Sequence, residues 1–194
     1  MTLRPPRTIR FPAFRPKLPP MDRRWLITFA TTLLLWSVVV QINHYLAPHG
    51  AYLYVGGLLV AFAPLRLGLR NGLIATMLAG LAVDALEPVP FGTHLVLFAV
   101  MHVVIFHLRT RFPREEAIFG VVVALLANLA LFLGLSFALL GSHPASGAAW
   151  VRLFVDLLWS QLFIVVVAPW FFAFQERALE LGRVDLVEES RVTF

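Results

Sequence analysis

Four long stretches of this chain carry no Asp, Glu, Lys or Arg. They are residues 25–65, 88–108, 117–151 and 157–175. An α-helix rises about 1.5 Å per residue, so roughly 20 apolar residues cross the hydrocarbon core of a bilayer. Because 59% of the residues are hydrophobic and the longer stretches have room for one or two spans each, the sequence predicts an integral membrane protein.

Turn-forming residues divide these stretches further. Pro48 and Gly50 lie in a short turn that splits the first stretch in two. The expected spans are residues 25–46, 51–65, 69–86, 91–108, 117–140 and 151–174. The second is short, and a re-entrant hairpin over residues 51–86 would preserve much of the same pattern. The predicted fold class is all-α, a polytopic membrane helix bundle of about six transmembrane helices in one domain.

Lysine and arginine residues are distributed very unevenly around these spans. With six crossings, fifteen of the sixteen would face one side of the membrane, and only Arg152 would face the other. Cytoplasmic loops carry an excess of Lys and Arg, so the asymmetry predicts that both termini are cytoplasmic. We therefore expect a basic, proline-rich cytoplasmic tail (1–24), a six-helix transmembrane domain (25–174) and a short cytoplasmic C-terminal tail (175–194).

The composition also argues against several function classes. The net charge of +5 would suit nucleic acid, but the cations flank the spans and form no continuous face with interleaved aromatics. The lipid bilayer is the expected partner instead. The chain has no cysteine, which excludes disulfides, thiolate catalysis and Cys-ligated metals. The sequence motifs of zinc hydrolases, serine hydrolases and P-loop proteins are missing. We expect no catalytic residue, no bound metal and no cofactor.

Small and polar residues recur every four positions along the third expected span. Gly72, Thr76, Gly80 and Asp84 form a stripe that drifts slowly around the helix. Small residues at this spacing let two helices approach closely in lipid. We expect Gly72, Thr76 and Gly80 to form a helix-contact face, against another span of this chain or, less favoured, against a partner helix.

Asp84 ends this stripe, and its position is costly for a carboxylate unless the group is hydrated, protonated or paired. The turn that follows contains two prolines, which donate no backbone N–H group. We expect Asp84 to accept backbone N–H groups of the turn before Gly92. A role through hydrogen-bond geometry alone predicts that asparagine would serve in its place.

Two histidines of the fourth expected span lie eight residues apart. His94 and His102 therefore share one face of a helix. A metal site would need further ligands at fixed spacing, and Asp84 is the only candidate nearby. Neutral histidines that hydrogen-bond between helices are the favoured interpretation.

The sixth expected span has a polar side. Arg152 and Asp156 are one turn apart, with the spacing of a structural ion pair. Ser160 and Gln161 continue this side, and Asn128 of the fifth span is expected to hydrogen-bond across to it.

One segment resembles a known family. A small-residue helix ends in Gly-Leu-x-x-Asp at residues 80–84, and a proline turn follows. Phe91 and Gly92 then precede the next helix, where His94 occupies a position that is often Asn or His in that family. This run, Gly80 to His94, resembles the signature of the MreD family of rod shape-determining membrane proteins. The likeness extends over residues 68–108, and the family-motif turn is carried by Asp84, Gly92 and His94.

The resemblance implies a non-enzymatic scaffold in the bacterial machinery of cell elongation. Members of the family sit in the bacterial cytoplasmic (inner) membrane and act in cell shape and lateral peptidoglycan synthesis. The implied partners are MreC, a RodA-type glycosyltransferase, a class B penicillin-binding protein and, across the membrane, MreB filaments.

A different class of protein has similar size and helix number. This is the substrate-binding membrane component of an energy-coupling factor vitamin transporter. That alternative requires a deep outward pocket on which polar groups of several helices converge. The candidate groups are Asp84, Asn128, Arg152, Asp156, Ser160 and Gln161.

Overall fold

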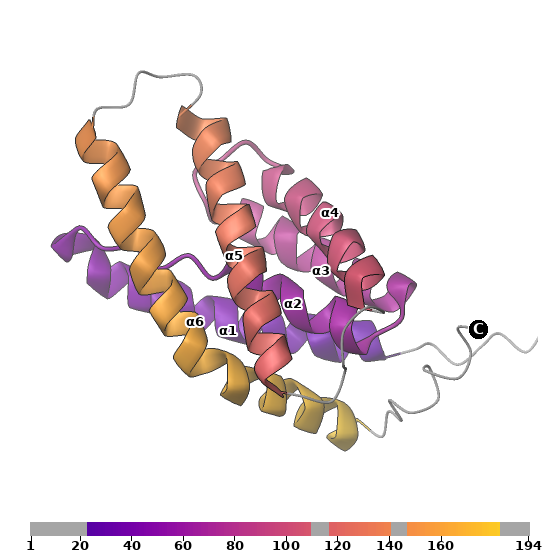
Figure 1. Ribbon diagram of the computed structural model, residues 1–194. Coiled ribbons are helices and arrows are strands. Elements are labelled where there is room, and N and C mark those ends of the chain that lie inside the picture. Colours follow the sequence, from indigo (N-terminus) through magenta and orange to yellow (C-terminus); the bar gives the residue numbers. More distant parts are fainter. Residues whose placement is uncertain (1–22, 110–116, 141–146, 183–194) are drawn as a thin grey trace, which may run out of the picture.

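The computed structural model describes residues 23–109, 117–140 and 147–182 of the 194-residue chain (Figure 1). All regular structure in these ranges is helical, so the predicted all-α class is confirmed. The elements are α1 (Arg24–Leu46), the short 3₁₀ turn η1 (Ala47–His49), α2 (Gly56–Arg66), α3 (Leu69–Asp84), α4 (Thr93–Leu108), α5 (Ala117–Leu140) and α6 (Gly147–Leu181). The expected N-terminal tail (1–24) lies almost wholly outside the described residues. Of the expected C-terminal tail (175–194), the part that is described continues α6.

Three helical stretches are long and apolar enough to cross a membrane. They are Arg24–His49, Ile118–Phe137 and Gly147–Leu181. α2 has 11 residues and α3 and α4 have 16 each, or about 16 and 24 Å at the usual rise. These lengths fall short of a hydrocarbon core of about 30 Å. Within the described residues there are therefore six α-helices, the expected number, and three of these have the length and apolar character of a full crossing.

The second expected span, residues 51–65, is wrong over its first five residues. Residues 51–55 are not helical, and Leu53, Tyr54 and Val55 are nevertheless buried. Side chains satisfy part of this backbone. The Asn43 amide donates to Leu53 O (2.9 Å) and accepts from Leu53 N (2.8 Å), and Ser160 Oγ accepts from Tyr54 N (2.9 Å). Irregular backbone is tolerated at membrane depth where protein groups replace the missing ladder bonds.

α2 forms the centre of the bundle. Every residue from Gly56 to Pro64 is buried, as expected for a short helix that is apolar on all sides. α2 packs against α3, α4 and α5, while α1 packs against α3 and α6, and α5 lies between α2 and α6 (Figure 1). At Gly57 a Cβ atom would overlap the Asn128 backbone of α5, so the glycine permits the close approach of these two helices.

Arginine side chains gather at one end of the bundle, which we call the arginine end. Arg66 at the end of α2 pairs with Glu176 of α6 (2.6 Å). Arg109, just after α4, donates to the carbonyls of Pro64 and Leu67 (2.8 Å each). At the opposite end, which we call the acidic end, the connection between α1 and α2 bonds to α6 through Asp156 and Ser160 and to the α3–α4 turn through Glu87.

Aromatic residues on α6 mark two levels along the bundle. Trp150 and Trp170 are exposed and twenty residues apart, about 30 Å along a helix, with Trp159 exposed between them. Trp25 and Tyr45 of α1 have the same separation. Trp and Tyr are enriched at the two membrane surfaces, so this spacing matches the thickness of a hydrocarbon core.

Candidate functional site

Asp84 is the hub of the turn between α3 and α4. Its Oδ1 accepts from His94 N (2.8 Å) and pairs with His94 Nδ1 (2.9 Å), and its Oδ2 accepts from Gly92 N and Leu95 N (3.0 Å each). The first N–H groups of a helix have no partner within the helix, so this carboxylate caps α4 from the end of α3. Both side chains of the Asp84–His94 pair are almost fully buried.

Two glycines let this turn close. Gly92 has a φ of 95°, in the left-handed region that other residues rarely adopt. A Cβ atom on Gly80 would lie 2.8 Å from His94 O and 2.9 Å from the Leu95 Cα, both backbone atoms of α4. The residues of the family-motif turn, Asp84, Gly92 and His94, thus meet at one place together with Gly80.

The contact stripe lies between α3 and α4. A Cβ on Gly72 would lie 2.6 Å from the His102 ring, and Thr76 Oγ1 lies 3.0 Å from His102 Nδ1 while it donates to Gly72 O (2.8 Å). Gly72, Thr76 and Gly80 therefore all face α4 of the same chain. His94 and His102 lie on the buried face of α4. No group of three or more potential metal ligands occurs among the described residues.

A cavity of about 420 Å³ opens at the acidic end of the bundle, and we call it the outer cavity. Its walls come from the α1–α2 connection, the α3–α4 turn, and α4, α5 and α6. The lining residues are Tyr52, Tyr54, Glu87, Pro88, Val89, His94, Phe132, Leu135, Ser136, Ala149, Arg152, Leu153 and Asp156. Ligand pockets commonly have volumes of about 300–1,000 Å³ and mainly apolar walls with a few polar groups.

Tyr52 forms hydrogen bonds to two acidic residues at the rim of this cavity. Its hydroxyl donates to Glu87 Oε1 and its backbone N–H donates to Asp156 Oδ1 (3.1 Å). Burial and the neighbouring Glu87 carboxylate both raise the pKa of Tyr52, which lies outside the helices, so its hydroxyl stays protonated and can donate. The expected Arg152–Asp156 pair is long, 3.9 Å between Arg152 Nε and Asp156 Oδ2, and the Arg152 side chain is 66% exposed.

The polar groups proposed for an outward pocket only partly meet there. Arg152 and Asp156 line the outer cavity, whereas Asp84, Asn128, Ser160 and Gln161 do not. The expected bond from Asn128 to α6 is wrong, because Asn128 Oδ1 accepts from Gly57 N of α2 (3.1 Å). Gln161 instead donates to Leu125 O of α5 (3.1 Å).

Sequence reasoning missed Tyr52, Tyr54 and Glu87 as cavity residues. Tyr52 and Tyr54 both line the outer cavity from the non-helical residues 51–55, so the pair becomes a recognisable feature only once this path of the chain is known. Asn43 is the residue that could have indicated this non-helical segment. An asparagine near the end of an apolar helix can hydrogen-bond to the backbone of a neighbouring segment.

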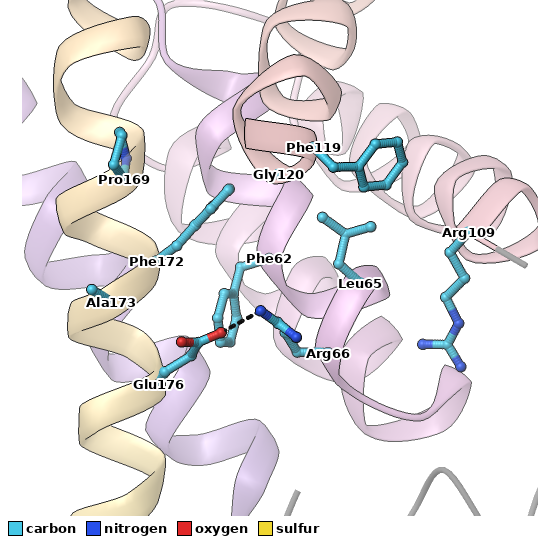
Figure 2. A pocket seen from close by; sticks show the side chains of 10 residues that line it. All are labelled: Phe62, Leu65, Arg66, Arg109, Phe119, Gly120, Pro169, Phe172, Ala173 and Glu176. Carbon is cyan, nitrogen blue, oxygen red and sulfur yellow. Dashed lines mark ion pairs between the residues drawn. The ribbon is translucent and has the colours of Figure 1, made fainter. Parts of the chain in front are cut away.

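A smaller pocket of about 120 Å³ lies at the arginine end. Figure 2 shows the Arg66–Glu176 ion pair bridging from α2 to α6 beside Phe62 and Phe172, with Arg109 on the other side of the view. The Arg109 guanidinium also stacks over Phe106, 3.8 Å from the ring centroid. The contacts of Arg66 and Arg109 beside this pocket join α2 to α6 and to the end of α4.

No protein family model, no curated protein and no solved structure matches this chain.

Proposed function

We propose that this chain is a non-enzymatic membrane scaffold of the MreD type, acting in bacterial cell elongation and lateral peptidoglycan synthesis. The observation that carries the proposal is the convergence of the motif residues. Asp84, Gly92 and His94, which are separated in the sequence by a proline turn, form one hydrogen-bonded cluster, and Gly80 lets α4 approach it. A motif that builds one compact structural element supports the resemblance better than scattered matches would.

The cluster suggests how a scaffold would present a contact surface. Asp84 holds a turn on which Leu86 and Phe91 are 66% and 72% exposed. Exposed aromatic and aliphatic side chains on a rigid support are typical anchors of protein interfaces. We propose that Leu86 and Phe91 contact a partner at the outer surface of the membrane, and that Asp84 serves by fixing their position.

The proposed setting is the bacterial cytoplasmic membrane, crossed several times, with both termini in the cytoplasm. The arginine end, with Arg66 and Arg109, would then face the cytoplasm and the acidic end the periplasm. Partners of the family type are MreC, a RodA-type glycosyltransferase and a class B penicillin-binding protein, which would meet the acidic end, and MreB filaments, which would meet the arginine end.

Depletion and complementation in the native host test this proposal. Loss of the chain should widen or round rod-shaped cells and disperse lateral wall synthesis. Wild type and Val100→Leu, an apolar change at an exposed site on α4 away from the turn, should restore rods. Phe91→Asp should accumulate normally yet fail to restore them. Unchanged cell shape on depletion would refute the proposal.

A second candidate function is favoured by one observation, the outer cavity with Arg152 and Asp156 at its rim. This is the substrate-binding membrane component of an energy-coupling factor vitamin transporter. Under that proposal, depletion would leave cell shape unchanged and cause a growth defect that one vitamin relieves. Normal uptake of every vitamin after depletion would remove this candidate.

A further inference from the structure

The hydrogen-bond donors on the wall of the outer cavity are largely used within the protein. The Tyr52 hydroxyl and backbone N–H donate to Glu87 and Asp156. Ser136 Oγ donates to Phe132 O (2.8 Å). Of the lining side chains, Arg152 keeps donors, but its side chain is 66% exposed; the carboxylate and hydroxyl oxygens keep the capacity to accept hydrogen bonds.

Two further lining side chains offer the cavity no accessible donor. His94 Nδ1 lies 2.9 Å from Asp84 Oδ1, an acceptor when ionised, so in the neutral form of the ring Nδ1 carries the proton and Nε2 is an acceptor. The Tyr54 hydroxyl oxygen is buried beside Gly56 and is inaccessible from the cavity. The wall therefore favours a ligand that brings its own donors.

The charges of the lining side chains also favour a ligand that brings hydrogen-bond donors. Among the residues that line the outer cavity, the acidic side chains are Glu87 and Asp156 and the basic one is Arg152. The Asp156 side chain is only 10% exposed, whereas that of Arg152 is 66% exposed and therefore well screened by solvent. A ligand in the cavity would meet an excess of negative charge.

The remaining walls are aromatic and aliphatic. Tyr54 and Phe132 pack edge to face, with ring centroids 5.8 Å apart, and Tyr54 lies 6.2 Å from the His94 ring. Aromatic faces attract cations, and apolar walls bind the body of an amphipathic molecule.

We propose that the outer cavity binds a small amphipathic cation, an ammonium group on an aromatic or aliphatic body. The ammonium group would donate to Glu87 or to Asp156, and the body would lie against Tyr54 and Phe132. This inference does not depend on either proposed function. The site is complete within one chain, and ligand binding to it is measured on the purified protein alone.

Three probes of equal shape and different charge test the proposal. They are 1-naphthylmethylamine, the neutral 1-naphthylmethanol and the anion 1-naphthoate. Equilibrium dialysis of each against the full chain in uncharged maltoside micelles, with empty micelles subtracted, gives its Kd. The amine should bind at least tenfold more tightly than the alcohol, and the naphthoate should bind more weakly than the alcohol.

Variants of the lining residues then test whether the preference for the amine arises in the outer cavity. Glu87→Gln with Asp156→Asn should reduce the preference for the amine to less than threefold while leaving the binding of the alcohol unchanged. Glu180→Gln, a matched loss of a carboxylate at the arginine end, should keep the tenfold preference. Equal binding of all three probes, absence of saturable binding, or an unchanged preference in the double variant would each overturn the proposal.

An ammonium group also occurs in a lipid headgroup, and competition separates the two sources. If the natural occupant is a soluble amine, phosphatidylethanolamine and phosphatidylglycerol should displace the probe equally weakly. If it is a lipid ammonium, phosphatidylethanolamine alone should displace it. Stronger displacement by phosphatidylglycerol would contradict a cation site altogether.

Discussion

Replacing Asp84 should destabilise the bundle by an amount that depends on how many of its hydrogen bonds survive. The carboxylate makes four: one oxygen meets His94 N and Nδ1, and the other meets the N–H groups of Gly92 and Leu95. A hydrogen bond to a charged group contributes about 1.5–3 kcal/mol. Asparagine keeps one acceptor oxygen but places an NH₂ group opposite two N–H donors, so two of the four hydrogen bonds are lost. Asp84→Asn should therefore lower the free energy of unfolding by about 3 kcal/mol.

Asp84→Ala removes all four bonds. Their contributions share one site and are not additive, so we expect a loss of about 5 kcal/mol. The free energy of unfolding is measured by titrating the protein in maltoside micelles with sodium dodecyl sulfate and following helicity. Glu180→Gln, which removes one partner of an exposed ion pair, is the control and should not change the transition measurably. If Asp84→Asn unfolds at the same detergent fraction as the wild type, the two-oxygen cap is not what holds the turn.

The other predictions use the same unfolding assay or simple labelling. Gly80→Ala should cost about 1–3 kcal/mol because the methyl group meets the α4 backbone, whereas Gly134→Ala, with nothing within 4 Å, should be neutral; equal effects would refute the close contact. Arg109→Met should cost about 2 kcal/mol because it uncaps the last carbonyls of α2, and a wild-type transition would refute that role. A single cysteine at His49 should react with an impermeant thiol reagent in intact cells and one at Gly182 should not, and the reverse pattern would invert the proposed orientation.

Much of the architecture could be predicted because membrane constraints act on composition. The apolar runs and the turn signals predicted α1, α3, α4 and α5 with ends close to those observed. The sixth helix was predicted over residues 151–174, but α6 is longer at both ends (Gly147–Leu181). The start of the second span could not be predicted in the same way. Residues 51–55 are as apolar as a membrane helix, and their irregular path depends on side chains of other helices, Asn43 of α1 and Ser160 of α6. Tertiary hydrogen bonds of this kind leave no periodic signal.

In the candidate site, too, contacts between residues close in the sequence could be predicted, and contacts between distant residues could not. The role of Asp84 as an acceptor for the next turn followed from local sequence, because both the carboxylate and the proline turn lie within a few residues of one another. Its use of both oxygens did not, and from this geometry we now predict that asparagine would serve less well than aspartate. Asn128 was assigned to the wrong helix because the close approach of α2 at Gly57 is a property of the packed bundle.

Affinity purification from gently solubilised native membranes tests the central proposal most directly. The tagged full-length chain, purified at native expression level, should bring down MreC together with a glycosyltransferase or a penicillin-binding protein. Phe91→Asp, purified in equal amount, should lose them. Recovery of a transporter ATPase pair in place of the cell-wall proteins would contradict the scaffold and favour the vitamin transporter component.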